Sequence, residues 1–346
     1  MPNELVTRAI DRLASRKDLS VEETAEVLAE IMHGEVSETQ IAGFLIALRT
    51  KGESVEELTG LAQTMRALAA HVPTEREDLL DTSGTGGGRS TFNVSTTAAL
   101  IAAGAGCAVA KHGNRSATRR SGSADLLEAL GARIDLDPRA VAHCIEEAGF
   151  GFMFAPAHHQ ATRFVVPVRR ELAVRTIFNL LGPLTNPAGA RRQLIGVSDP
   201  LFLETIAGAL ARLGVDRALV VAGEDGLDEV SISSVTKVVE VNGEEIRRYT
   251  LTPAEVGIEP AAGDFAGGEP TENAAVTRAI LQGAVGASAD LAAINAGAAI
   301  YAAGMADTIA AGVQAARESI ADGRAENTLD RYLDASRRYA PAEVAG

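Results

Sequence analysis

Residues 81–96 read Asp81-Thr82-Ser83-Gly84-Thr85-Gly86-Gly87-Gly88-Arg89-Ser90-Thr91-Phe92-Asn93-Val94-Ser95-Thr96. They lie between a short apolar run at 79–81, which predicts a strand, and a helical pattern at 95–105. Glycines let backbone amides approach an anion closely, and a helix start favours negative charge. The stretch therefore predicts a strand, a phosphate-binding loop and a helix in succession.

This loop matches neither of two common nucleotide-binding motifs. It lacks the Gly-Lys-Ser/Thr ending of a P-loop and the Gly-x-Gly-x-x-Gly spacing of a dinucleotide site. A glycine-rich turn by itself can also be a plain connection. The Thr and Ser side chains gathered between a strand and a helix favour an anion site.

Strands and helices continue to alternate after the glycine-rich loop. Further strands are predicted at 108–111, 151–154, 194–197 and 219–222, further helices at 123–130, 138–148 and 200–213, and a hairpin at 235–251 with Asn242-Gly243 as its turn. The C-terminal part is Ala-rich and helical. We expect an α/β fold with a mostly parallel central sheet flanked by helices, whose ligands gather at the carboxyl ends of the strands.

The first 70 or so residues predict a small helical unit instead. Capping boxes that mark helix starts are expected at Ser20-x-x-Glu23, Ser37-x-x-Gln40 and Ser54-x-x-Glu57. Gly34 and Gly52 stand where the preceding helices should end.

Length and composition bound the class of protein. The chain has 346 residues, of which 46% are apolar, 23% charged and only 4% aromatic. This is a globular composition with an aliphatic core, and at about 150 residues per domain it suggests two domains. We expect a helical domain over 1–72, joined by part of 165–190, and an α/β domain over 73–346.

The formal net charge of −14 bears on partners and compartment. Binders of nucleic acid or anionic membranes need a cationic face, so we expect neither partner. The longest apolar stretch, 98–110, is too short to span a membrane, and the acidic start predicts no signal peptide. Cys107 and Cys144 have no CxxC spacing and are expected to be reduced core thiols of a cytoplasmic protein.

A second segment supplies positive charge at the edge of the sheet where the glycine-rich loop is expected. It reads Lys111-His112-Gly113-Asn114-Arg115-Ser116-Ala117-Thr118-Arg119-Arg120-Ser121-Gly122-Ser123 and follows the next predicted strand. Charge runs usually mark only a solvated face. The interleaved Gly, Ser and Asn residues favour a loop wrapped around a polyanion.

Asp228 and Glu229 lie in a loop after another predicted strand. Such a pair occurs often by chance, but Mg²⁺ takes one or two carboxylates together with phosphate oxygens, and two anion loops are expected nearby. His158 and His159 lack a Glu or Cys partner at zinc-ligand spacing, so a surface pair is expected there. Arg169 is a candidate to hold a carboxylate through two hydrogen bonds.

These segments occur in the order and spacing of one family. Two further stretches belong to the same pattern, Ser121-Gly122-Ser123-Ala124-Asp125 and the run from Arg169-Arg170-Glu171 to Pro187. Over nearly its whole length the chain resembles the anthranilate phosphoribosyltransferases. The resemblance implies a nucleoside-phosphorylase-like fold, usually a homodimer, with two Mg²⁺ ions per subunit. It implies transfer of the phosphoribosyl group of 5-phosphoribosyl 1-pyrophosphate (PRPP) to the amino group of anthranilate, giving N-(5-phosphoribosyl)anthranilate and pyrophosphate in tryptophan biosynthesis.

The resemblance also assigns residues to the ligands. PRPP would be bound by Gly84, Gly87, Gly88, Thr91, Asn93, Val94, Ser95, Thr96, Lys111, His112, Gly113, Asn114, Arg115, Ser116, Ala117, Thr118, Arg119 and Ser123. Anthranilate would contact Gly84, His112, Asn114, His158, Arg169 and Pro183. One Mg²⁺ would be held by Ser95 and Glu229 and the other by Asp228 and Glu229.

The glycine-rich loop departs from the family pattern. The family reads Gly-Thr-Gly-Gly-Asp-Gly, whereas this chain has Gly84-Thr85-Gly86-Gly87-Gly88-Arg89-Ser90, without the Asp and one residue shorter. Whether Gly88 contacts the substrate depends on how the missing Asp and the shorter loop change its position. We expect Arg89 to supply positive charge near the pyrophosphate.

The implied chemistry needs no covalent nucleophile, because positioning and electrostatic stabilisation suffice once metal neutralises the leaving pyrophosphate. The amine would attack the anomeric carbon with inversion, Arg169 would hold the carboxylate, and His112 is the first candidate for a base. Two alternatives are a pyrimidine nucleoside phosphorylase of the same fold, which does not require the Asp228-Glu229 pair, and a non-catalytic relative that binds nucleic acid. Stimulation by Mg²⁺ and salt-sensitive retention on DNA distinguish them.

Overall fold

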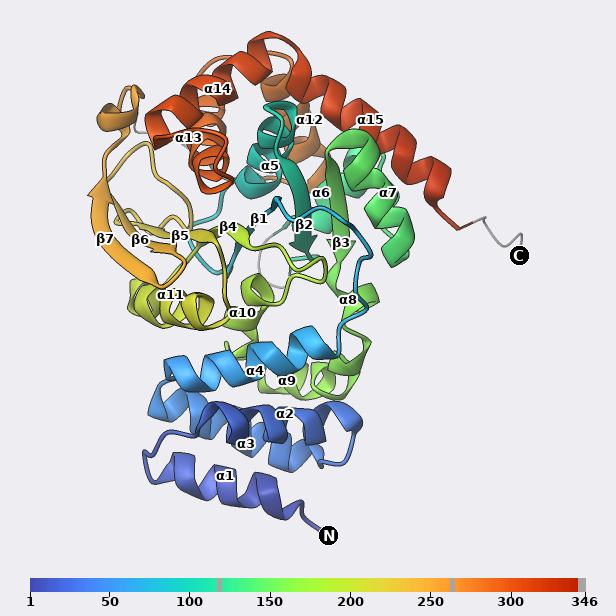
Figure 1. Ribbon diagram of the computed structural model, residues 1–346, viewed down its shortest axis with the longest axis vertical. Coiled ribbons are helices and arrows are strands. Elements are labelled where there is room, and N and C mark those ends of the chain that lie inside the picture. The colour runs from blue at the N-terminus through green and yellow to red at the C-terminus, as the bar shows by residue number, and fades with distance from the viewer. Residues whose placement is uncertain (117–119, 262–264, 342–346) are drawn as a thin grey trace.

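The computed structural model describes residues 1–116, 120–261 and 265–341. Figure 1 shows an N-terminal bundle of helices below an α/β body whose central sheet is covered by helices above and below. The chain passes from the bundle into the sheet and later returns to the bundle through α9 and α10 (Figure 1).

The bundle begins with four helices whose starts are set by side-chain caps. Ser20 and Ser54 form the expected reciprocal capping boxes with the Glu three residues later. At Ser37 the expectation is only half right, because the Gln40 side chain instead bonds the backbone of Asn3, with Oε1 and Nε2 each at 2.9 Å. The helices are α1 (Glu4–Ala14), α2 (Val21–His33), α3 (Glu38–Lys51) and α4 (Val55–Ala67).

Seven strands form one sheet in the described part of the chain, in the order β3-β2-β1-β4-β5-β6-β7. The first five are parallel, and β6 and β7 are antiparallel, as the hairpin signal predicts. The strand β1 extends to Gly84, three residues beyond the prediction, because it pairs with β4 along this whole length. The bounds are β1 (Leu79–Gly84), β2 (Ala108–Gly113), β3 (Phe150–Phe154), β4 (Arg192–Gly196), β5 (Arg217–Gly223), β6 (Thr236–Asn242) and β7 (Glu245–Leu251).

Helices cover both faces of the sheet. α5, α7, α13, α14 and α15 gather on one side, and α10 and α11 lie between the other side and the bundle (Figure 1). The helix predicted at 200–213 starts as a 3₁₀ turn at Pro200–Phe202 and becomes α-helical only at Leu203. The helices after the bundle are α5 (Val94–Gly104), α6 (Ser123–Leu130), α7 (Pro138–Ala148), α8 (Ala155–His158), α9 (Val166–Leu172), α10 (Phe178–Leu181), α11 (Leu203–Arg212), α12 (Pro270–Leu281), α13 (Ala287–Ala302), α14 (Ile309–Ala321) and α15 (Arg324–Tyr339). Further 3₁₀ turns span Gln160–Phe164, Gly182–Leu184 and Pro253–Val256.

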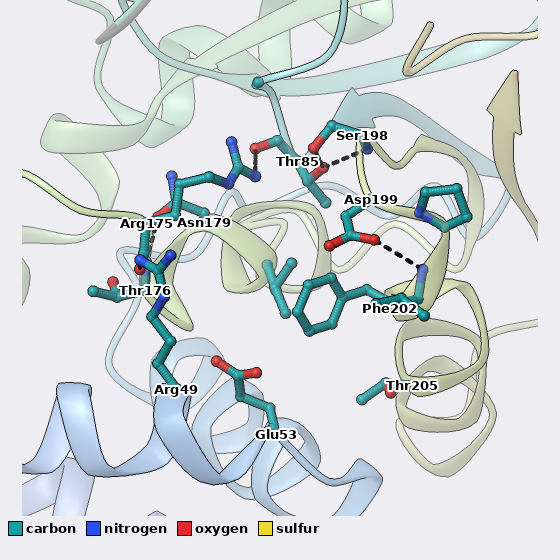
Figure 2. Close-up of a pocket in the computed structure, with 15 residues that line it drawn as sticks. Arg49, Glu53, Thr85, Arg175, Thr176, Asn179, Ser198, Asp199, Phe202 and Thr205 are labelled. Carbon is teal, nitrogen blue, oxygen red and sulfur yellow. Dashed lines mark hydrogen bonds between the residues drawn. The ribbon is translucent and has the colours of Figure 1, made fainter. Parts of the chain in front are cut away.

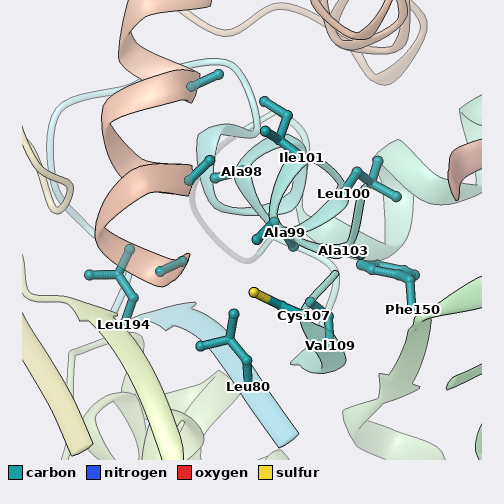
Figure 3. Packing of buried hydrophobic residues seen from close by; sticks show 14 of the residues in the cluster. Leu80, Ala98, Ala99, Leu100, Ile101, Ala103, Cys107, Val109, Phe150 and Leu194 are labelled. Carbon is teal, nitrogen blue, oxygen red and sulfur yellow. The ribbon is translucent and has the colours of Figure 1, made fainter. Parts of the chain in front are cut away.

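The core of the α/β body is aliphatic, as the composition predicts. Small side chains of α5, among them Ala98 and Ala99, pack against Leu80, Leu194 and Cys107 (Figure 3). They allow the helices to lie close to the sheet, so that many atoms gain van der Waals contact without large side chains. The expectation of unpaired core thiols is confirmed, since both cysteines are free and buried, and burial raises the pKa of each to about 12.

A second apolar cluster joins the bundle to later parts of the chain. Val168 of α9 and Leu180 of α10 are buried together with side chains of α2, α3 and α4. This brings the 165–184 segment, which carries Arg169, against the carboxyl edge of the sheet. Among the helices of the described ranges, none combines the length and the apolar character needed to cross a membrane.

Candidate active site

A cleft of about 920 Å³ opens at the carboxyl ends of β1 and β2. Most residues that the resemblance implies for PRPP line it, together with Arg169, Pro183, Asp228 and Glu229. Two implied residues, Thr96 and His158, do not belong to this lining in the described ranges. Three others, Ala117, Thr118 and Arg119, lie outside the described residues.

The glycine-rich loop, 84–90, lies directly against the acidic loop that carries Asp228. Gly86 and Gly87 adopt the left-handed region, with φ of 62° and 89°, which favours glycine. A Cβ on Gly88 would lie 2.5 Å from Asp228 Oδ1, so glycine is required for this close approach. The shortened loop therefore still brings its backbone beside the carboxylate.

Arg89 lies at the end of the glycine-rich loop. Its guanidinium lies over the ring of Phe265 at 5.9 Å, and Arg89 is absent from the described lining of the cleft. Its backbone amide donates to the Gly226 carbonyl at 2.8 Å, which ties the end of the glycine-rich loop to the acidic loop. The backbone of Arg89 thus holds the loop in place, and its charge near the pyrophosphate stays a prediction.

Lys111 provides a buried cation at the floor of the cleft. Its side chain is 1% exposed, its Nζ donates to the Thr82 carbonyl, and Nζ lies 3.4 Å from Ser95 Oγ. Burial lowers the pKa of Lys111 to about 8, although the carboxylates of Asp81 and Glu229 act in the opposite direction. A buried amine close to its own pKa is a strong but pH-sensitive partner for phosphate.

Asp81 is a buried carboxylate beneath the cleft that acts on the charge of Lys111, and sequence reasoning missed it. It is fully buried in β1, its Oδ1 accepts from the His112 backbone amide at 3.1 Å, and burial raises its pKa to about 6. The available signal was a carboxylate that directly follows the apolar pair Leu79-Leu80 in a predicted strand.

Three histidines lie buried beside the floor, so the expected surface pair at 158–159 is wrong. His158 and His159 are only 1% and 5% exposed, and their rings bond the carbonyls of Ala70 and Thr185. Backbone carbonyls from the segments that link the bundle to the sheet therefore bond one ring nitrogen of each, and Nε2 of His158 has no hydrogen-bond partner among the described atoms. Burial lowers the pKa of His159 to about 4 and lowers that of His158 as well.

His112 lies against this pair, with its ring centroid 5.1 Å from that of His159. Its Nδ1 is 3.1 Å from the Gly182 carbonyl, so Nδ1 carries the proton and Nε2 is left as an acceptor. Nε2 has no hydrogen-bond partner among the described atoms. Burial lowers the pKa of His112 to about 3, so the ring is neutral at physiological pH.

Asp228 and Glu229 line the cleft at 4% and 8% exposure. Asn295 of α13 holds their loop, because its Oδ1 accepts from the Val230 amide and its Nδ2 donates to the Val230 carbonyl, both at 2.9 Å. No group of three or more His, Cys, Asp or Glu that could hold a metal occurs in the described ranges. Two carboxylates facing a phosphate cleft nevertheless fit Mg²⁺, which takes its remaining ligands from phosphate and water.

Arg169 of α9 borders the cleft from the side of the bundle. Its guanidinium lies over the Phe178 ring at 5.4 Å, and no hydrogen bond or ion pair engages it within the described residues. Burial lowers the pKa of Arg169. A stacked cation with unused donors is suited to a planar carboxylate.

Two other basic residues of the second segment, Arg115 and Arg120, also line the cleft. Arg115 pairs with Asp125 at 2.8 Å and with Glu128, so its charge is already satisfied.

Asn93 connects segments distant in sequence, because its Oδ1 accepts from Ser121 Oγ at 3.0 Å and from Asn273 Nδ2 at 2.8 Å. No local sequence signal identified Asn273, which lies 180 residues away.

Two family models of glycosyl transferases match the chain. The helical bundle domain of the glycosyl transferase family matches residues 7–69, and the a/b domain of that family matches residues 76–326. An anthranilate phosphoribosyltransferase of Moorella thermoacetica is 52% identical over 94% of this chain and 96% of its own length. One of Rubrobacter xylanophilus is 50% identical over 97% and 99%. The chain belongs to the anthranilate phosphoribosyltransferase family, which confirms the resemblance seen in its motifs.

Solved structures of this family share the fold. The crystal structure of anthranilate phosphoribosyltransferase from Thermus thermophilus has a TM-score of 0.90 and 48% identity, covering 95% of this chain and 99% of that one. The enzyme from Saccharomyces cerevisiae in complex with PRPP and Mg has a TM-score of 0.88 and 27% identity, covering 97% and 99%.

Proposed function

We propose that this cleft is where the chain carries out the reaction of its family, the transfer of the phosphoribosyl group of PRPP to the amino group of anthranilate. The observation that carries the proposal is the convergence of two phosphate-type loops, a carboxylate pair and Arg169 on one cavity. The Saccharomyces cerevisiae relative has been solved with PRPP and Mg and with 4-fluoroanthranilate, which supports this assignment.

PRPP would lie between the glycine-rich loop and Lys111, with its pyrophosphate toward Asp228 and Glu229. We assign two Mg²⁺ ions per subunit, one to Ser95 and Glu229 and one to Asp228 and Glu229. When bound, Mg²⁺ neutralises the pyrophosphate and so makes it a better leaving group. Lys111 adds a fixed positive charge that needs no reorganisation during the reaction.

Anthranilate would lie on the side of the bundle. Arg169 would hold its carboxylate, which fixes the amine beside the anomeric carbon of PRPP. His112 lines the cleft beside this position, with its Nδ1 held by the Gly182 carbonyl. Because the pKa of His112 is lowered to about 3, we assign it an orienting part rather than storage of the proton. The Asp228-Glu229 pair favours this reaction over the pyrimidine nucleoside phosphorylase alternative.

The arrangement of the whole protein is part of the proposal. We assign a helical domain to 1–72 with part of 165–190 and an α/β domain to 73–346, supported by the packing of α9 and α10 on the bundle. We also assign a homodimer, which agrees with the exposed apolar side chains Ile46 of α3 and Val166 of α9, at 38% and 42% exposure. We assign a cytoplasmic location, which agrees with the two free cysteines.

The test mixes the purified protein with anthranilate, PRPP and Mg²⁺ and follows the loss of anthranilate fluorescence. We expect loss that stops with EDTA and falls at least about a thousandfold in the double variant Asp228→Asn, Glu229→Gln, since removal of metal ligands removes most transition-state charge stabilisation. A double variant as active as the parent would refute the metal assignment. No turnover of the parent at any Mg²⁺ concentration would refute the function.

A further inference from the structure

The glycine-rich loop is held at the wall of the cleft by Arg175, a residue to which the assignments above give no part. Arg175 Nη1 donates to the Gly86 carbonyl at 2.7 Å, and Nη2 donates to the Thr85 carbonyl at 3.1 Å. Figure 2 shows the guanidinium reaching the loop from the side of the bundle. A Cβ on Gly87 would lie 2.0 Å from Nη1, so the guanidinium fills the space that a side chain would need.

These two hydrogen bonds fix the direction of the loop's amides. In a trans peptide the C=O and the following N–H point in opposite directions, and the described residues contain no cis peptide bond. Carbonyls of Thr85 and Gly86 that face Arg175 therefore turn the amides of Gly86 and Gly87 away from it. Both glycines line the cleft. Amides oriented in this way can donate to a phosphate.

A loop of this composition needs such a restraint. Three consecutive glycines have more backbone freedom than other residues, and that freedom is lost when a ligand orders them. The loop's other backbone hydrogen bonds within the described ranges lie near its ends, from Thr85 N to the Gly196 carbonyl at 2.9 Å and from Arg89 N to the Gly226 carbonyl at 2.8 Å. Arg175 holds the part between them.

The bundle in turn holds Arg175. Arg49 of α3 donates to the Arg175 carbonyl, and Asn179 of α10 accepts from the amide of the next residue, Thr176, at 2.9 Å. Arg175 also borders a second cavity of about 730 Å³ between α3, α10 and α11, so it forms part of the wall between that cavity and the cleft (Figure 2).

We propose that Arg175 is a positioning residue that orders the glycine-rich loop for PRPP and links this order to the helical bundle. The inference rests on the proposed function, because PRPP is the ligand for which the loop is ordered. It concerns the loop before PRPP binds, and this separates it from a direct contact between the guanidinium and the substrate.

The experiment compares the parent with Arg175→Ala, Arg175→Lys and Arg248→Ala. Arg248 is a matched control, since it also makes two side-chain hydrogen bonds, to Glu204 at 2.7 Å each, but on β7, away from the cleft. Hydrogen exchange of the 84–92 peptide is measured without substrate. Affinity for PRPP with Mg²⁺ is measured by calorimetry, and both KM values are measured by anthranilate fluorescence.

Arg175→Ala is expected to speed exchange of the 84–92 peptide several-fold and to weaken PRPP binding about tenfold, the effect of losing one to two hydrogen bonds. The KM for anthranilate should change less than about threefold, because Arg169 and its support are untouched. Arg175→Lys keeps the charge and one hydrogen bond, so its exchange rate and PRPP affinity should lie between those of the parent and of Arg175→Ala. This variant replaces Arg175→Ala if that variant does not fold. Arg248→Ala should match the parent.

The outcomes separate the two proposals. Unchanged loop exchange in Arg175→Ala overturns the positioning role, and weaker PRPP binding without faster exchange means that the arginine contacts the substrate directly. Unchanged exchange and affinity in a parent that binds PRPP overturns the inference alone. A parent that binds no PRPP overturns the proposed function, while the exchange data still decide whether Arg175 orders the loop.

Discussion

The floor and the rim of the cleft are built by opposite means. The floor, Asp81, Lys111 and His112, consists of strand residues that are buried and whose pKa values are shifted by that burial. The rim, the loops at 84–90 and 224–230, consists of backbone held by side chains from other elements, among them Asn295 and Arg175. The floor therefore contributes charged side chains, and the rim contributes backbone groups held in fixed positions.

The difference shows where mutations should act. A change in the floor alters the electrostatic field that a polyanion meets, so its effect is large and depends on pH. A change in a residue that holds the rim alters the population of a productive loop conformation, and its effect is limited by the one or two hydrogen bonds lost.

Within this comparison of floor and rim, the largest effect is expected from the charge of Lys111. Its pKa of about 8 means that the free enzyme loses this charge as the pH rises above 8, so kcat/KM for PRPP should fall about tenfold per pH unit there, if the neutral form is inactive. Lys111→Arg should remove this alkaline limb, because the guanidinium stays charged. Lys111→Met should lower kcat/KM at pH 7 at least about a hundredfold.

Folding stability should move in the opposite direction over the same range. The pKa of Lys111 is lowered from 10.5 to about 8 in the folded chain, so between these values the unfolded chain binds more protons. Stability then rises with pH as activity falls. Urea unfolding of the parent at pH 8 and pH 10 tests this. Lys51→Met is the control, because Lys51 pairs with Asp18 and Glu57 in the bundle, far from the cleft. If the fall of kcat/KM above pH 8 persists in Lys111→Met, a group other than Lys111 causes that fall.

A middle-sized effect is expected from Asn295, which holds the acidic loop of the rim. Asn295→Ala leaves the Val230 amide and carbonyl without their partner, so we expect the Mg²⁺ concentration for half-maximal activity to rise about tenfold. Thr277→Val is the matched control, since it removes a buried hydrogen bond to Thr97, 2.9 Å long, without touching the acidic loop. Equal Mg²⁺ requirements in both variants would mean that Asn295 has no special effect on the metal site.

Local sequence signals were sufficient for Lys111 and His112 of the floor, but not for Asp81, and for the existence of the rim. Short apolar runs predict the strands. Because parallel strands end at one edge of the sheet, the sequence also predicts that 84–96, 111–123 and 228–229 lie close together. Caps such as Ser20 and Ser54 are also local, since donor and acceptor are three residues apart.

The residues that hold the rim escaped prediction for a physical reason. Arg175, Asn273 and Asn295 bond partners 65 to 180 residues away in sequence, and a lone polar residue carries no mark of such a partner. The burial of His158 and His159 depends likewise on carbonyls of Ala70 and Thr185, which only the folded chain brings to them.

The smallest effect concerns the turn that carries Arg175 to the rim. Ala173 follows α9 in the left-handed region, with φ of 51° and ψ of 28°, which costs a non-glycine residue about 1 kcal/mol. Ala173→Gly removes this strain but gives the unfolded chain more freedom, so we expect a net gain of about 0.5 kcal/mol in the free energy of unfolding. Urea unfolding measures it.

Arg16 provides the comparison for this turn, because it is also a non-glycine residue in the left-handed region, at φ 59°, but lies after α1 in the bundle. Arg16→Gly should give a similar gain without any change in the KM for PRPP. Ala173→Gly should raise that KM by about twofold, since a freer turn lets Arg175 leave the loop more often. A lower stability of Ala173→Gly would mean that contacts of the Ala173 methyl outweigh the backbone strain. An unchanged KM would mean that the bonds of Arg49 and Asn179 hold the segment without help from the turn.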